Sequence, residues 1–186
     1  MSPDRPSRGL LLAPGASAGP DQPALVAIDR AATAAGVAVQ RIGLARGGKP
    51  PALIEVVRRA AAGLAEAHGL EPAAVAMGGR SFGGRICSMA AADGVPCLAL
   101  VLVSYPLHPP GRPDTLRVDH FPALTIPCLF VSGTRDAFAT PAELESHTAA
   151  IPGPVHRVWI DGADHGLRGR DADVAAAVVD WLISST

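Results

Sequence analysis

The feature that most constrains the fold is an apolar run that leads directly into a serine flanked by glycines. Residues 75–78 are apolar or small, Gly79-Arg80-Ser81-Phe82-Gly83 follows, and small residues at helical spacing continue to Ala92. In this pattern a strand turns so sharply into a helix that the central serine is strained, and the glycines leave room for neighbouring backbone. The turn presents the Ser81 hydroxyl at the positive end of the helix. We therefore interpret residues 75–85 as a nucleophile elbow.

Other apolar runs alternate with helical patterns on both sides of the elbow. We expect strands over residues 9–13, 37–42, 74–77, 98–103, 128–132 and 155–160. We expect helices over residues 22–35, 52–68, 82–93, 141–151 and 172–183, with Asp21 and Thr140 as caps of the first and fourth. Residues 104–126 contain five prolines and receive no regular assignment. Right-handed crossovers place helices on both faces of such a sheet. The prediction is an α/β fold: a three-layer αβα sandwich around a parallel, doubly wound sheet of about six strands.

The composition fits one domain built around a buried sheet. Hydrophobic residues make up 48% of the 186 residues, which is enough for a full core. No internal repeat or long linker divides the chain. We expect a single domain over residues 1–186, with residues 1–8 flexible.

Charge and cysteine usage exclude several functional classes. The formal net charge is -1 and no dense basic cluster occurs, which argues against nucleic-acid binding. No apolar run approaches the roughly 20 residues of a membrane span, and the first residues lack a signal-peptide pattern. Cys87, Cys97 and Cys128 are unevenly spaced in apolar contexts, as reduced core residues are. We expect a cytoplasmic protein without a metal or cofactor.

Candidate catalytic residues follow three of the predicted strands. A serine hydroxyl is a poor nucleophile until a base removes its proton, and an acid fixes the tautomer of that base. In elbow-containing sheets the acid and then the base follow later strands, at the carboxyl edge where ligands bind. Asp136 follows the fifth predicted strand and His165 follows the sixth. We predict Ser81 as the nucleophile, Asp136 as the acid and His165 as the base.

Competing side chains fit these roles less well. The other histidines end a helix, lie on a helix, lie within a strand or belong to the proline-rich segment: His68, His147, His156 and His120. Asp161 and Asp164 compete with Asp136, but they are too close in sequence to His165 to orient its imidazole.

The oxyanion donors and the substrate pocket are expected at the same carboxyl edge of the sheet as the catalytic residues. Acyl transfer needs N–H groups aimed at the developing oxyanion, and one is expected from the backbone of Phe82. The second is expected from Gly15 or Ala16, in the loop after the first strand. We expect Arg80, Tyr105 and His108 to line the pocket; the segment with Tyr105 and His108 follows directly from the predicted strand at residues 98–103.

These motifs resemble the α/β-hydrolase superfamily and, more narrowly, small capless bacterial hydrolases similar to the dienelactone hydrolases. The resemblance runs from Leu10 to Leu182 and rests on four segments: residues 78–85, 105–111, 131–136 and 162–165. It implies a minimal fold without a cap domain. It also implies the roles of Ser81, Asp136 and His165 given above.

The chain departs from the family pattern in two respects, which limits what can be carried over about its substrate and its oxyanion hole. Dienelactone hydrolase proper uses a cysteine nucleophile, whereas this chain has Ser81, so that substrate is not carried over. The first two strands of the full fold are expected to be absent, and the 14–16 loop lacks the His-Gly start common in relatives.

The sequence therefore predicts a serine hydrolase of small carboxyl esters or thioesters, acting through an acyl-enzyme on Ser81. The alternative is a catalytically silent binding or scaffold module with the same fold, which has no need to keep all three residues. An exposed edge strand would allow a homodimer.

Overall fold

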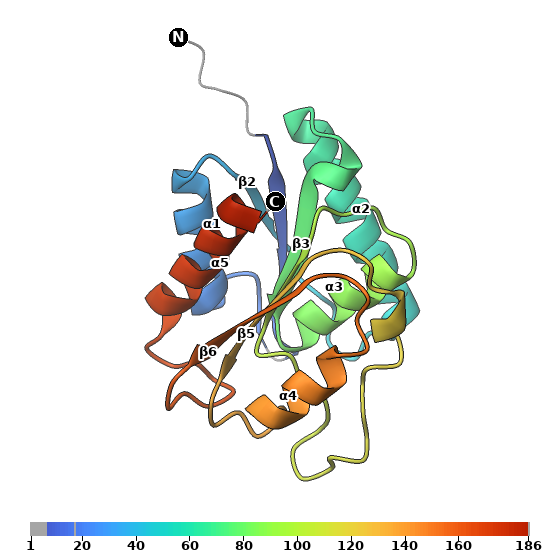
Figure 1. Ribbon diagram of the computed structural model, residues 1–186. Coiled ribbons are helices and arrows are strands. Elements are labelled where there is room, and N and C mark those ends of the chain that lie inside the picture. Colours follow the sequence, from blue (N-terminus) through green and yellow to red (C-terminus); the bar gives the residue numbers. More distant parts are fainter. Residues whose placement is uncertain (1–6, 17, 186) are drawn as a thin grey trace.

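The computed structural model describes residues 7–16 and 18–185, which form one parallel sheet between two layers of helices (Figure 1). The strands of this part of the chain are β1 (Gly9–Ala13), β2 (Ala38–Arg41), β3 (Val75–Arg80), β4 (Leu100–Val103), β5 (Cys128–Gly133) and β6 (Val155–Ile160). The helices are α1 (Pro23–Ala34), α2 (Pro50–His68), α3 (Phe82–Ala92), α4 (Pro141–Thr148) and α5 (Asp171–Ser185). Short 3-10 turns occur at Pro72–Ala74 and Phe121–Ala123.

The strands lie in the order β2-β1-β3-β4-β5-β6, and each neighbouring pair is parallel. Helices α1 and α5 cover one face of the sheet and α2 and α3 cover the other (Figure 1). Alternate side chains of one strand therefore enter different cores. Leu11 packs with the α2 and α3 side, whereas Leu10 and Leu12 pack with the α1 and α5 side. The predicted fold class is confirmed.

Helix ends follow the local sequence at most positions, with one exception. Thr140 caps α4 in a capping box with Glu143, as predicted. Helix α2 begins at Pro50, two residues earlier than expected, because proline is favourable in the first turn. The prediction that Asp21 caps α1 is wrong. Gln22 occupies the N-cap position without a side-chain cap, and the Asp21 carboxylate instead accepts a hydrogen bond from Arg41 Nη1 at 2.8 Å.

The three cysteines are free and buried, in agreement with their interpretation as core residues. Burial raises the pKa of all three thiols, to about 12 for Cys97 and Cys128. Within the described residues, no helix has the length and apolar character that a membrane crossing requires. No three His, Cys, Asp or Glu side chains of those same residues gather as a metal site.

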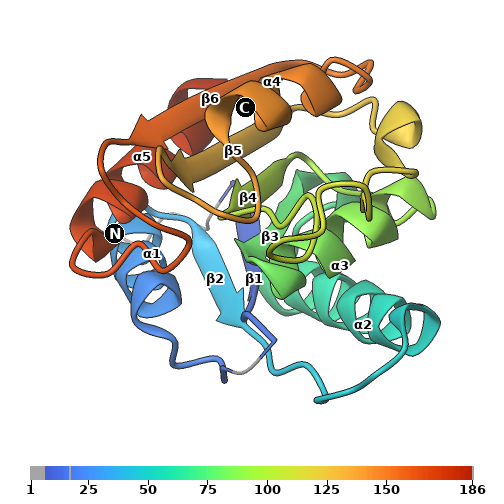
Figure 2. The ribbon, with the colours of Figure 1, turned by 90° about the horizontal axis from the view of Figure 1, so that it is seen from below.

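The two ends of the described chain lie close together. Most of the segment expected to be flexible, residues 1–6, lies outside the described residues. Arg8 is anchored, because its guanidinium donates a hydrogen bond to the carbonyl oxygen of Leu182 in α5. Figure 2 shows the opposite end of the sheet, where the loops after β3, β5 and β6 meet.

Candidate active site

The elbow between β3 and α3 holds Ser81 in a strained backbone conformation. Its φ and ψ are 50° and −115°, outside the regions that L-residues normally adopt. The elbow packs tightly against the end of β1. A Cβ added to Gly79 would lie 2.0 Å from the Ala13 carbonyl oxygen, and one added to Gly83 would lie 2.3 Å from the same atom. Only glycine fits at these two positions, which explains the spacing of the motif.

The predicted nucleophile, base and acid lie in one continuous chain of hydrogen bonds. Ser81 Oγ is 2.9 Å from His165 Nε2. His165 Nδ1 is 2.9 Å and 2.8 Å from the two carboxylate oxygens of Asp136. A carboxylate accepts but does not donate, so Nδ1 carries the proton and Nε2 is free to accept the serine proton. The arrangement can generate a serine alkoxide at the moment of attack.

Residues after β5 hold both the acid and the base. The Asp136 side chain is fully buried, and its Oδ1 accepts a hydrogen bond from the Phe138 N–H at 2.8 Å. The Phe138 ring stacks on the His165 imidazole, with centroids 3.9 Å apart and planes inclined by 23°. The imidazole therefore has a fixed plane, and 18% of the His165 side chain is exposed to solvent.

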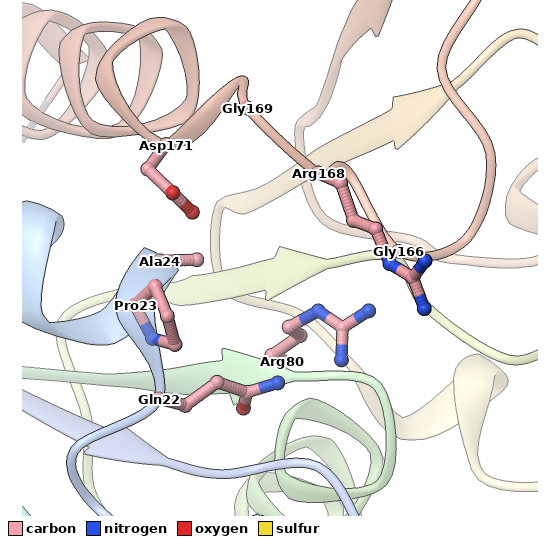
Figure 3. Close-up of a pocket in the computed structure, with 8 residues that line it drawn as sticks. All are labelled: Gln22, Pro23, Ala24, Arg80, Gly166, Arg168, Gly169 and Asp171. Carbon is pink, nitrogen blue, oxygen red and sulfur yellow. The ribbon is translucent and has the colours of Figure 1, made fainter.

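Arg80, expected in the substrate pocket, reaches the backbone of the base. Its Nη2 donates a hydrogen bond to the His165 carbonyl oxygen at 2.6 Å. Burial lowers the pKa of Arg80, and the negative charges of Asp136, Asp164 and Asp171 oppose that effect. A cavity of about 390 Å³ borders this side chain, between the start of α1 and residues 166–171 (Figure 3).

The predicted oxyanion donors differ in whether their N–H groups already donate a hydrogen bond. Phe82 is the first residue of α3, and the first N–H groups of a helix have no acceptor within the helix. The Gly15 N–H already donates to Gln22 Oε1 at 3.1 Å. Ala16 is therefore the better candidate of the two for the second donor.

Tyr105 and His108 follow β4 but point into packed surroundings. Tyr105 is completely buried; its hydroxyl donates to the Arg117 carbonyl and its ring packs edge-on against Phe130. His108 is 5% exposed, and its Nδ1 donates to the Pro109 carbonyl at 2.8 Å. Among the described residues, no hydrogen bond or ring contact joins either side chain to Ser81 or His165.

A second serine–histidine pair was not anticipated from the sequence. His120 Nε2 lies 2.8 Å from the oxygen of the buried Ser88 on α3. The Ser88 hydroxyl donates its proton to the Arg85 carbonyl at 2.8 Å, so His120 must be the donor to Ser88. A general base must accept a hydrogen bond from the serine hydroxyl, whereas His120 donates one to Ser88. The pair fastens the proline-rich segment to α3, and no local sequence signal predicts a contact between a helix and a loop without regular structure.

Because His120 is partly buried, we expect the stability of the fold to be sensitive to acid. Burial lowers the pKa of His120 from 6.5 to about 4, the nearby Arg85 charge adds to this, and Asp119 opposes it. Between these values the unfolded chain binds a proton that the folded chain does not, so stability falls as the pH drops from 6.5 to 4. We expect a loss on the order of 2 kcal/mol, below the full linkage value because the ring is partly exposed. Urea unfolding at several pH values measures it.

His120→Gln keeps an N–H donor for Ser88 without a titrating ring, so it should reduce this dependence on pH. The exposed His156→Gln controls for the loss of one histidine. If the free energy of unfolding changes with pH equally in His120→Gln and in the unmodified protein, His120 is not the source of the dependence.

Comparison with known proteins identifies the family. A family model described as an alpha/beta hydrolase domain matches residues 6–178. The chain belongs to this alpha/beta hydrolase family. Epoxide hydrolase A of Mycobacterium tuberculosis is 37% identical over 60 residues, a match that covers 32% of this chain and 19% of that protein. The chain thus spans about a fifth of that relative's length.

Solved structures share the fold over nearly the whole chain. An esterase domain from a Rhodothermus marinus protein has a TM-score of 0.76 and 21% identity, covering 97% of this chain and 88% of that one. Dienelactone hydrolase from Anabaena variabilis gives the same four values. A protein of the alpha/beta superfamily from Xanthomonas campestris has a TM-score of 0.73 and 20% identity, covering 95% of this chain and 99% of that one. The resemblance to small hydrolases of the dienelactone hydrolase type is confirmed for the fold.

Proposed function

We propose that this protein is a serine hydrolase that cleaves small carboxyl esters or thioesters through an acyl-enzyme on Ser81. The observation that carries the proposal is the hydrogen-bonded chain from Ser81 Oγ through His165 to the buried Asp136. Membership in a hydrolase family and a fold shared with an esterase domain support it.

Acylation begins when Ser81 Oγ attacks the carbonyl carbon and His165 Nε2 takes the hydroxyl proton. Asp136 stabilises the imidazolium that forms, and the N–H groups of Phe82 and Ala16 stabilise the oxyanion. As the tetrahedral intermediate breaks down, Nε2 returns the proton to the leaving alcohol or thiol. The bond to that group breaks, and the acyl group remains on Ser81.

Deacylation repeats the sequence with water as the nucleophile. His165 Nε2 takes a proton from the water as its oxygen attacks the acyl carbon, and then protonates Ser81 Oγ. The products are a carboxylic acid and free enzyme. No other side chain gains or loses a proton over the full cycle.

Covalent labelling tests this proposal. A fluorophosphonate reacts readily only with a serine activated by a base, so we expect one adduct, located on Ser81 by peptide mass spectrometry. Ser81→Ala should not be labelled. Ser88→Ala is the matched control, since Ser88 also contacts a histidine but receives its hydrogen bond, and it should be labelled like the unmodified protein.

A folded protein that resists the reagent would overturn the proposal and favour the binding-module alternative. Labelling confined to another residue would equally exclude Ser81 as the nucleophile.

A further inference from the structure

Arg80 connects the backbone next to Ser81 to the backbone of His165. It is the last residue of β3 and immediately precedes Ser81. Its guanidinium bonds to the main-chain oxygen of His165, 85 positions away in the sequence. Figure 3 shows the side chain extending from the strand end toward the segment that contains Gly166 and Arg168. One side chain therefore spans the gap between the two halves of the site.

The start of the segment that carries the base, residues 161–170, is bonded to the loop after β5, because the Gly162 N–H donates to Thr134 Oγ1. Beyond Ala163 its main-chain hydrogen bonds lie mostly within the segment itself. Gly166 N–H donates to Asp164 Oδ1, and Leu167 N–H donates to the Asp164 carbonyl. Leu167 has a φ of 49°, an unfavourable value for a residue with a branched side chain. Burial in the core holds the strained Leu167, whereas no main-chain bond within the described segment holds His165, whose carbonyl is bonded from outside the segment.

Two features show where that support comes from. The cavity of about 390 Å³ lies against Gly166 and Gly169, so this side of the segment is not held by close packing. The Arg135 N–H donates to the Ala163 carbonyl, which anchors the start of the segment. At His165 itself, the hydrogen bond from Arg80 is the main-chain anchor that the structure describes.

Arg80 also adjoins the loop after β1. Its Nη1 lies 3.4 Å from the position that a Cβ on Gly15 would occupy, and the Gly15 N–H is bound by Gln22. A guanidinium keeps its charge even when half-buried, and a hydrogen bond from a charged donor is stronger than a neutral one. Arg80 is thus suited to hold the backbone around the site and need not contact the substrate.

We propose that Arg80 is a positioning residue that fixes the His165 backbone and thereby sets the distance between Ser81 Oγ and His165 Nε2. This inference rests on the proposed function of the two side chains. The sequence analysis expected Arg80 to line the substrate pocket. In this proposal Arg80 acts instead by holding the backbone of His165. Misplacement of a base by about 1 Å costs roughly 100-fold in rate, which sets the scale of the expected effect.

Chemical rescue tests the inference. Arg80→Ala should lower kcat roughly 10- to 100-fold with little change in KM, because substrate binding is not altered. The truncation would join the space of the lost guanidinium to the existing cavity. Millimolar guanidinium or ethylguanidinium should enter this space and restore part of kcat, and Arg80→Lys should have intermediate activity.

Arg168→Ala is the matched control, since Arg168 lines the same cavity but is exposed and, in the part of the chain that the structure describes, makes no hydrogen bond to His165. It should keep kcat and show no response to guanidinium. A rise in KM with unchanged kcat in Arg80→Ala would assign Arg80 to substrate binding and overturn the inference.

A measurement without turnover separates this inference from the proposed function. The His165 Nδ1 proton, bonded to Asp136, should give a downfield NMR signal that is assigned by its loss in His165→Gln. In Arg80→Ala this signal should broaden through exchange with water, and guanidinium should sharpen it again. If Arg80→Ala does not fold, Arg80→Lys is measured in its place. An unchanged signal overturns the positioning role, whether or not Ser81 proves to be the nucleophile.

Discussion

Ser81→Ala should lower kcat for hydrolysis of a short p-nitrophenyl ester by about 10⁴- to 10⁶-fold. Loss of the hydroxyl removes the acyl-enzyme route completely, and the remaining rate comes from oxyanion stabilisation and binding alone. The fold should persist, because Ser81 Oγ contacts the base and its removal leaves the main-chain bond from Ser81 N–H to Val103 intact. Initial-rate kinetics and a thermal unfolding scan measure the two effects.

Ser88→Ala provides the comparison for this experiment, since it removes a serine hydroxyl from the same helix region. It should retain kcat, with a modest loss of stability from the broken contact with His120. Unchanged turnover in Ser81→Ala would exclude the acyl-enzyme mechanism.

Gly83→Ala should destabilise the protein by about 3 kcal/mol or more and reduce kcat as well. The added Cβ would lie 2.3 Å from the Ala13 oxygen and 2.6 Å from the Pro14 oxygen. Both neighbours are backbone atoms, so the end of β1 and the loop after it must shift. That loop carries Ala16, the proposed oxyanion donor. Urea unfolding measures the stability, and kcat for the same ester reports the displacement.

Gly63→Ala is the matched control, because Gly63 lies in the exposed part of helix α2 and an added Cβ meets nothing within 4 Å. It should stabilise the protein by roughly 0.5–1 kcal/mol, since alanine loses less backbone entropy in a helix. Equal effects of the two substitutions would show that the close approach of the elbow to β1 does not constrain the chain.

Much of the architecture could be predicted because the relevant signals are local. Apolar runs of four to six residues marked the buried strands, and the glycine spacing around Ser81 followed from the contact with Ala13. Parallel strands share one carboxyl edge, so the order of Ser81, Asp136 and His165 along the chain was enough to predict that they would meet. Their catalytic roles remain predictions.

What the sequence could not predict depends on contacts between distant loops. The Asp21 cap failed because Arg41, twenty residues away, offers the carboxylate a charged partner. The Gly15 N–H, one of the two predicted candidates for the second oxyanion donor, donates to the Gln22 side chain, a contact that the sequence does not reveal. The bond from Arg80 to His165 depends on the path of a strained segment, and residue types alone do not determine that path.

The contact between Arg8 and Leu182 has a practical consequence for engineering. It brings the start of β1 and the end of α5 together, at the amino end of the sheet, while Ser81 lies at the opposite, carboxyl end. A short linker could therefore join residues 7 and 185, the two ends of the described chain, in a circular permutant with new termini in an exposed loop such as residues 111–116. Surface attachment at this amino end of the sheet would leave the approach to Ser81, at the carboxyl end, unobstructed.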